Sequence, residues 1–202
     1  NGARFDRKLQ VERVVAMDPN FARGYEGVAM TATILPGWGY FDRDYRTVAV
    51  EAADKALALD PSLSSPWAVK GWAVQYGWPG DFERGLEYRD KAIAADPRNA
   101  TAYLWRGVSW FYLGFFDKAI ADFRECLRLD PAYDNCHNHL AAALVTRGDE
   151  KAGLTALEGN LERAIPVSRA EHFVGPLVAN GDRRAALAML ALLDVAPELR
   201  KP

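Results

Sequence analysis

The hydrophobic and polar positions of this chain repeat with the period of an α-helix. Apolar residues recur every three or four positions, in stretches separated by short breaks that contain Pro or Gly. That spacing places the apolar side chains on one face of a helix. No stretch keeps the alternation of apolar and polar residues that a half-buried strand requires. The pattern therefore predicts an all-α protein, with helices at residues 21–35 and 44–61 among the first along the chain.

Four of the breaks contain an Asp-Pro pair. Their prolines are spaced 42, 36 and 34 residues apart, which indicates an internal repeat with insertions in two of its units. Proline ends a helix, and we expect the aspartate before it to make local hydrogen bonds in the turn. The pairs are Asp18–Pro19, Asp60–Pro61, Asp96–Pro97 and Asp130–Pro131.

The clearest unit is residues 103–131, YLWRGVSWFYLGFFDKAIADFRECLRLDP. It has small residues where two helices would cross and bulky aromatic residues beside them, so that the helices can approach closely and the rings fill the remaining space. The positions concerned are Tyr103, Gly107, Trp110, Gly114 in the turn, Ala119, Phe123, Cys126 and Pro131. In residue type and spacing this stretch resembles a tetratricopeptide repeat.

The resemblance implies an all-α, right-handed superhelical solenoid of antiparallel helix pairs. We expect one repeat array over residues 1–202, opening on the second helix of a truncated repeat and ending on a helix pair that caps the stack. The predicted boundaries are 1–19 for the truncated repeat, 20–61, 62–97, 98–131 and 132–166 for the repeats, and 167–202 for the capping pair.

Composition and charge exclude some classes of function. Half of the 202 residues are hydrophobic and the formal net charge is −2, so the chain can bury a core and has no general attraction for nucleic acid. No apolar run approaches the roughly 20 residues of a membrane-spanning helix. The opening helical pattern suggests a domain trimmed from a larger protein, and a targeting signal or anchor could lie outside it.

The two cysteines, Cys126 and Cys136, each lie five residues from Pro131. A helical hairpin that turns at this proline would bring them close together, so they are a candidate disulfide in an oxidising compartment. Two buried thiols are the alternative. The sequence does not name the compartment; we favour the cytoplasm, or the periplasm if the cysteines are bridged.

The chain shows no residue set for catalysis. Phosphate-binding loops, nucleophile elbows and zinc-protease motifs are absent from the sequence, and we expect no enzyme activity and no cofactor. The run Cys136-His137-Asn138-His139 has soft ligands but lacks the spacing of a four-ligand site, so we expect a structural role and no metal. Lys70 and Arg106 replace a buried leucine of the repeat, and we expect their charges to reach solvent or an acidic neighbour.

The first helix of each repeat should line a concave groove, because second helices form the outer wall of such an array. Transferring the repeat register predicts the partner-binding residues Met30, Ile34, Trp72, Tyr76, Leu104, Val108, Phe111, Tyr112 and Asn138. Related chaperone modules grip an acidic tail with Lys, Asn and Arg on this wall. The corresponding positions here include Ala68, Trp72 and Trp105, so the resemblance does not carry that site over.

Three functions fit this pattern. We expect a scaffold that binds a peptide or helix of a partner protein, and the alternatives are a small-molecule sensor with an aromatic pocket around Trp72 and Phe111, or a homodimerisation array. Phrases such as QYGWPGDFERGLEYRDKAIAADP resemble the repeat modules that follow winged-helix DNA-binding or adenylate cyclase domains in bacterial regulators. That resemblance implies the sensory or partner-binding part of a larger regulator.

Overall fold

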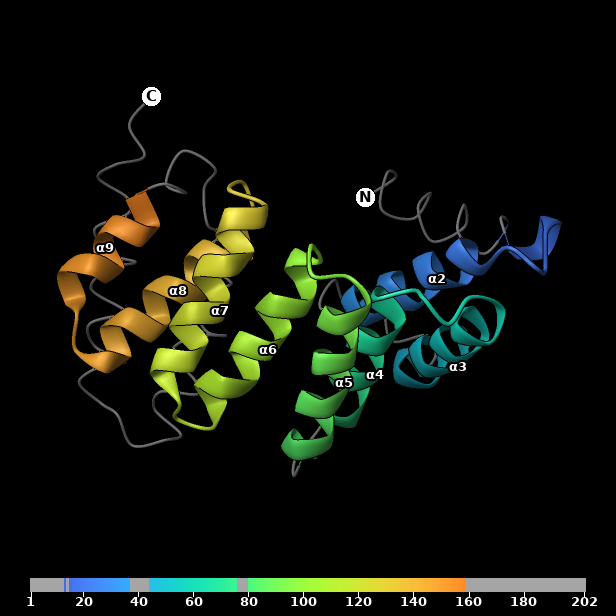
Figure 1. The fold of residues 1–202 in the computed structure, drawn as a ribbon, viewed down its shortest axis with the longest axis horizontal. Coiled ribbons are helices and arrows are strands. Elements are labelled where there is room, and N and C mark those ends of the chain that lie inside the picture. Colours follow the sequence, from blue (N-terminus) through green and yellow to red (C-terminus); the bar gives the residue numbers. More distant parts are fainter. Residues whose placement is uncertain (1–12, 14, 37–43, 76–79, 159–202) are drawn as a thin grey trace. The chain divides into compact units, whose positions relative to one another are not determined.

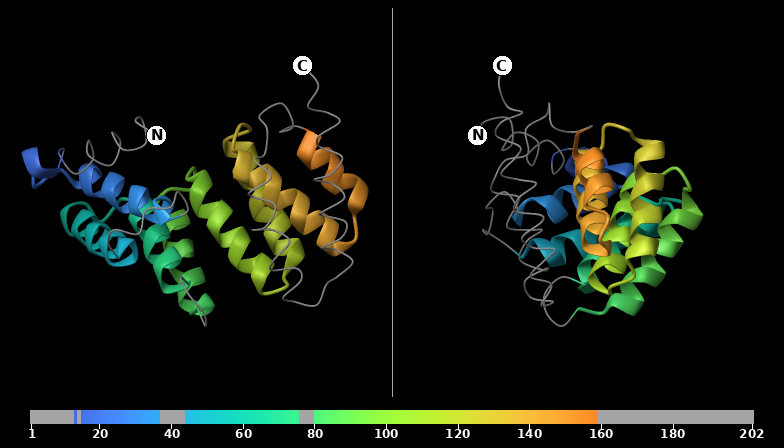
Figure 2. Two further views of the ribbon diagram at one scale, coloured as in Figure 1. Left: turned by 180° about the vertical axis from the view of Figure 1, so that it is seen from behind. Right: turned by 90° about the vertical axis from the view of Figure 1, so that its left-hand side faces the viewer.

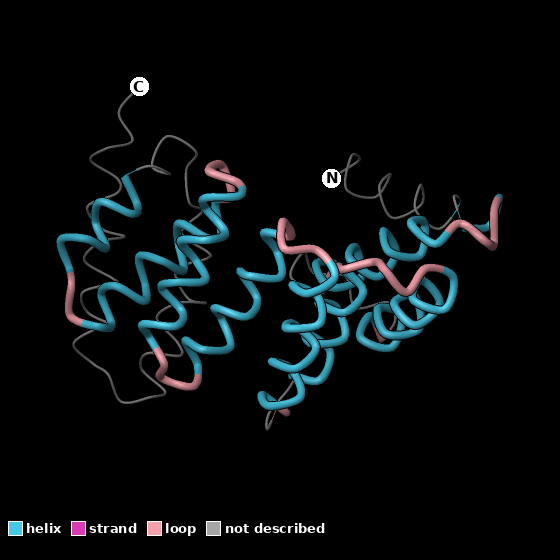
Figure 3. Tube along the Cα trace, in the orientation of Figure 1, coloured by secondary structure: helices cyan, strands magenta, loops and turns pink. Residues whose placement is uncertain are grey.

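The computed structural model describes residues 13, 15–36, 44–75 and 80–158. Within these ranges every residue lies in a helix, a turn or a loop (Figures 1 and 3), so the predicted all-α class is confirmed. None of the described helices is long and apolar enough to cross a membrane. The helices are α2 (Ala22–Ile34), α3 (Tyr45–Leu59), α4 (Ser65–Gln75), α5 (Phe82–Ala95), α6 (Ala100–Tyr112), α7 (Phe116–Leu129), α8 (Asp134–Arg147) and α9 (Glu150–Glu158).

The chain divides into two compact units, residues 1–105 and 106–202, with the boundary inside α6. In the first unit α2 packs against α3, α3 against α4, and α4 against α5. In the second unit α7 packs against α8 and α8 against α9, and these neighbours lie side by side in both views of Figure 2. Each element thus packs on its neighbours in sequence, as in a repeat protein.

The turns between repeats are held by aspartate side chains, as the sequence predicts. In each of the four Asp-Pro turns the Asp Oδ1 accepts a hydrogen bond from the backbone N–H two residues later, over 2.9–3.0 Å. Asp44 and Asp81 act as N-caps of α3 and α5, because their carboxylates accept from backbone amides of the first helical turn. At Asp44, hydrogen bonds from Thr47 lower the pKa of the carboxyl.

Two helices end on a glycine with a left-handed backbone. Gly114 has φ +80° and Gly148 has φ +104°, a region that other residues enter only with strain. After α6, the Gly114 N–H donates to Phe111 O and the Phe115 N–H to Trp110 O, the two bonds of a Schellman motif. The chain can therefore reverse within three residues and begin α7 at once.

The core of the first unit is rich in alanine, which lets its helices approach closely. One cluster contains Ala29, Ala32, Leu35, Tyr45, Ala49, Ala52, Ala53 and Val69. Ala68, Ala92 and Ala102 form a second cluster, and the half-buried Trp105 packs against both. In the second unit Phe123 is fully buried, and a Cβ placed on Gly107 would lie 2.6 Å from its ring. The predicted small-residue crossing at Gly107 is therefore present.

Several predicted segments lie outside the described residues. These are the opening helix up to residue 12, the loop at residues 37–43, the turn at residues 76–79, and residues 159–202, which include the predicted capping pair.

Candidate interaction surface

The predicted groove residues of the first unit are mostly packed. Met30 and Trp72 are half-buried against the larger alanine cluster. Leu104 is only 3% exposed, whereas Ile34 is 44% exposed and stands free of the core. Tyr76 lies outside the described residues.

The second unit divides in the same way. Phe111 and Asn138 are 6% and 2% exposed, and Val108 is half-buried. Tyr112, by contrast, is 43% exposed. Leu104, Phe111 and Asn138 therefore do not form an open groove wall. The transferred register treated the whole face of each first helix as free of packing, but these three side chains are enclosed by the protein.

An exposed apolar surface forms instead at the turn between α6 and α7. Tyr112, Leu113 and Phe115 are 43%, 40% and 51% exposed within four consecutive positions. We call these three residues the apolar turn. Isolated exposed apolar residues are ordinary, but adjacent ones mark sites of interaction. Leu113 and Phe115 are absent from the predicted groove, although the sequence run YLGFF at residues 112–116 was a signal for them.

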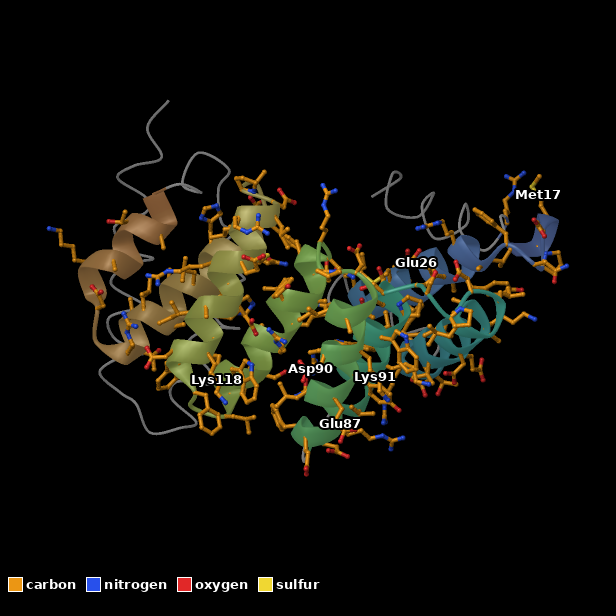
Figure 4. The ribbon with its side chains drawn as sticks, viewed as in Figure 1. Met17, Glu26, Glu87, Asp90, Lys91 and Lys118 are labelled. Carbon is orange, nitrogen blue, oxygen red and sulfur yellow. A yellow bond between two sulfur atoms is a disulfide. The ribbon has the colours of Figure 1, made fainter. Side chains whose placement is uncertain are left out.

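Ring contacts hold this turn in place. Phe115 meets Trp110 edge to face with centroids 5.6 Å apart, which supplies the hydrophobic contact that accompanies a Schellman motif. The Lys118 Nζ lies 4.3 Å from the Trp110 centroid and 5.0 Å from that of Phe115, a cation–π arrangement. Lys118 is labelled in Figure 4. Partial burial raises the pKa of the Tyr112 phenol.

The two cations at the leucine position of the repeat do reach acidic neighbours, which confirms that prediction. The Lys70 ammonium pairs with Asp54. Arg106 forms a bidentate pair with Asp122, with Nε to Oδ2 at 2.9 Å and Nη2 to Oδ1 at 2.7 Å. Bidentate charged hydrogen bonds of this kind are among the stronger polar contacts in proteins.

A third cation was missed by the sequence reasoning. Arg89 of α5 is only 3% exposed, and its Nε and Nη1 atoms have no hydrogen-bond partner among the described residues. Desolvation lowers its pKa to about 9. The internal repeat could have revealed this residue. Arg89 lies 34 residues before Phe123, the same interval that separates Pro97 from Pro131, so it occupies a position that is apolar in the next repeat.

The residues of the His/Cys run have structural contacts. The ring nitrogens of His137 lie 3.1 Å from Ala156 O and 2.9 Å from Pro131 O, and the His139 ring stacks on Phe123. Cys136 forms a disulfide with Cys126 across the α7–α8 turn, with their Cα atoms 6.3 Å apart. Within the described part of the chain, no three His, Cys, Asp or Glu side chains come together as a metal site.

The first unit also contains a polar pocket of about 500 Å³ between α2 and the turns that precede α4 and α6. Its wall is internally hydrogen-bonded. Ser64 Oγ donates to Ala92 O over 2.7 Å and accepts from Asn99 Nδ2 over 2.8 Å. These hydroxyl and amide groups are therefore committed to the fold.

Comparison with known proteins identifies the repeat. Residues 100–133 match the family described as tetratricopeptide repeat. The chain is 31% identical over 118 residues to the human mitochondrial import receptor subunit TOM70, an alignment that covers 58% of this chain and 18% of that protein. This chain therefore corresponds to less than a fifth of that relative's length.

Solved structures show the same fold. A thermophilic tetratricopeptide protein of Thermus thermophilus superposes with a TM-score of 0.64 at 21% identity, covering 83% of this chain and 87% of that one. The Cut9–Hcn1 hetero-tetramer of the APC/C gives a TM-score of 0.69 at 17% identity, covering 98% of this chain and 39% of that one. Residues 100–133 are therefore a tetratricopeptide repeat, and the chain has the fold of the tetratricopeptide-repeat solenoids that it superposes on.

Proposed function

We propose that this chain is a protein-binding module that holds a peptide or helix of a partner protein. Tetratricopeptide-repeat proteins generally mediate protein–protein interactions. The observation that carries the proposal here is the apolar turn of Tyr112, Leu113 and Phe115, whose side chains are 40–51% exposed at adjacent positions.

The chemistry of the apolar turn supports this role. Aromatic residues are enriched at the centres of protein interfaces, where a few anchors carry most of the binding energy. The Schellman hydrogen bonds and the Trp110–Phe115 contact hold the turn in one conformation, so little conformational entropy is lost on binding. The contact with Trp110 explains why the exposed ring of Phe115 is held in place. Nothing in the fold explains why Leu113 is exposed.

The apolar turn is tested with Leu113→Ser and Tyr112→Ser. Peptides are first selected from a displayed library on the wild-type protein, and the affinity of a selected peptide is then measured for each variant. Loss of an anchor of about 2 kcal/mol weakens binding about 30-fold. Met17→Ser is the matched control, because Met17 is 84% exposed and lies in the other unit. Equal affinity of all four proteins would refute the proposal.

We further propose that the chain is the partner-binding part of a larger bacterial regulator. The resemblance of phrases such as QYGWPGDFERGLEYRDKAIAADP to the repeat modules of such regulators supports this. The sequence of the intact gene product tests the idea. A winged-helix or cyclase domain in the same polypeptide is the expected result, and an intact protein without either would contradict it.

The two alternative functions, a small-molecule sensor and a homodimerisation array, predict different outcomes in melting and sedimentation experiments. A metabolite that raises the melting temperature, in a panel applied to the wild-type protein, would favour a small-molecule sensor. A dimer mass in sedimentation, lost in Leu113→Ser, would make a second copy of this chain the partner of the apolar turn.

We infer from the Cys126–Cys136 bond that the chain works in an oxidising compartment, since reducing compartments keep thiols free. Rapid acid lysis of the native host stops thiol exchange, and alkylation of free thiols in denaturant at pH 8 then measures this. Protein that remains unmodified until a reductant is added is expected, and fully alkylated protein would place it in a reducing compartment.

A further inference from the structure

The buried guanidinium of Arg89 lies at the crossing of α4 and α5. Two glycines let these helices approach, because a Cβ on Gly71 would lie 2.9 Å from Gly85 O and 3.2 Å from Arg89 Cγ. A Cβ on Gly85 would lie 2.8 Å from Arg89 Nη1 and equally close to the side chain of Gln75. The charged group therefore occupies space that a glycine leaves open inside the unit.

Packing alone does not require a cation at this position. The equivalent residue of the next repeat is Phe123, 34 positions later, which is fully buried beside Gly107 just as Arg89 is buried beside Gly71. An apolar side chain would fill the same space without the penalty of burying a charge, which reaches several kcal/mol for an uncompensated ion. The cation at position 89 therefore has a role other than filling the core.

Arg106 shows how this fold neutralises an arginine. Its guanidinium is held by both carboxylate oxygens of Asp122, and that carboxylate is itself 8% exposed. The position 34 residues before Asp122 is Tyr88, which has no carboxylate to offer. Arg89 is thus a buried guanidinium whose Nε and Nη1 atoms are without an acceptor in the part of the chain that the structure describes.

We propose that Arg89 anchors a carboxylate-binding site in the first unit, which takes a small carboxylate or the acidic group of a peptide. The flat guanidinium presents a pair of N–H donors that match the two oxygens of a carboxylate. The side chain of Gln75 lies over the same glycine and so borders this site. Because desolvation strengthens charged hydrogen bonds, an anion that enters this site is held more firmly than on the surface. The site does not depend on the apolar turn, which belongs to the other unit.

Sodium acetate is the first probe, with sodium chloride at the same ionic strength as the reference. At ten times its Kd, a ligand that binds only the folded state should raise the melting temperature of the wild-type protein by about 3 to 6 °C. Above the Kd the rise should grow with the logarithm of the acetate concentration, as expected for a ligand that binds only the folded state. The ¹⁵N–¹H signal of the Arg89 Nε should shift along a saturating curve that gives the same Kd. An acetyl-glutamate amide and a peptide with a free C-terminal carboxylate are then compared. They show whether the site prefers the carboxylate of an acidic side chain or that of a chain terminus.

Arg89→Met removes the cation, and Arg84→Met is the matched control. Arg84 is an exposed arginine on the same helix, and its guanidinium already donates to the Tyr88 hydroxyl over 3.2 Å. The acetate effect should vanish in Arg89→Met and persist in Arg84→Met. An acetate response that survives in Arg89→Met, or a wild-type Nε signal that does not move, overturns the proposal. If Arg89→Met does not fold, the wild-type titration of the Nε signal decides alone. The affinity of Leu113→Ser for its selected peptide reports on the apolar turn separately.

Discussion

At the scale of single residues, the contrast between Phe111 and Tyr112 separates core from surface. The two rings are neighbours with centroids 6.0 Å apart, yet Phe111 is 6% exposed and Tyr112 is 43% exposed. Phe111 also meets Phe116 of α7 at 5.7 Å. Adjacent positions on one helix therefore serve different purposes, which the repeat register alone did not distinguish.

We predict that Phe111→Ala lowers the free energy of unfolding by about 3 to 5 kcal/mol, as deletion of a large buried ring does. Tyr112→Ala should change it by about 1 kcal/mol or less, because much of its side chain is already in water. Urea denaturation of both variants measures this. Equal losses would mean that Tyr112 belongs to the core and not to the apolar turn.

The charge of Arg89 predicts an unusual dependence of stability on pH. Desolvation lowers its pKa in the folded state to about 9, well below the ordinary value of an arginine in the unfolded chain. Below pH 9 the guanidinium is protonated in both states and the folded state bears the whole penalty of burying the charge. Between pH 9 and 12 the folded state loses this proton first, so the penalty falls as pH rises.

We therefore predict that Arg89→Met is more stable than the wild-type protein at pH 7 in chloride buffer, and that the difference narrows above pH 9. The difference is measured from the urea midpoints of both proteins at pH 7, 9 and 10.5. The other titrating groups are the same in the two proteins, so their contribution cancels in the comparison. A difference that stays constant over this range would show that the guanidinium is not desolvated in solution.

At the scale of helices, the second unit depends on the bond between α7 and α8. Cys126 and Cys136 are both fully buried, and their disulfide joins positions that are ten residues apart in the sequence. A covalent link across a short loop stabilises a protein mainly by restricting its unfolded chain.

We predict that reduction of this bond lowers the free energy of unfolding by about 2 to 3 kcal/mol. Thermal unfolding with and without a phosphine reductant measures the effect. The double variant Cys126→Ala/Cys136→Ala should be insensitive to the reductant, which makes it the control. If the wild-type protein is also insensitive, the bond is absent in solution.

At the scale of the whole molecule, stability should be local to each unit. Repeat proteins gain their stability from contacts between sequence neighbours, and described helices here pack on those neighbours. We predict that reduction of the disulfide accelerates amide hydrogen exchange in α7 and α8 and leaves α2, α3 and α4 unchanged. Exchange measured by mass spectrometry on peptides from both units tests this, and uniform acceleration would show a single cooperative unit.

The sequence by itself determined the fold class and, to within two residues, the ends of the helices expected at residues 21–35 and 44–61. Periodic apolar positions define the helices, and the Asp-Pro and Gly turns end them through local hydrogen bonds that require no distant partner. The small residue at Gly107 and the ring of Phe123 could also be predicted, because the crossing of paired helices repeats at a fixed interval. The acidic partners of Lys70 and Arg106 followed from the need of a buried charge for a counterion.

Only the tertiary structure decided which side chains remain exposed. Leu104, Phe111 and Asn138 were predicted to line the groove, but the side chains packed around each one enclose it. Leu113 is 40% exposed directly after α6, and its apolar side chain does not predict that exposure. Arg89 stands at the position of the repeat that Phe123 fills with a buried ring in the next unit. Whether its guanidinium finds an acceptor among the described residues depends on which atoms of α4 pack against it. Burial and hydrogen-bond satisfaction are properties of neighbours in space, and a helical period specifies only a face.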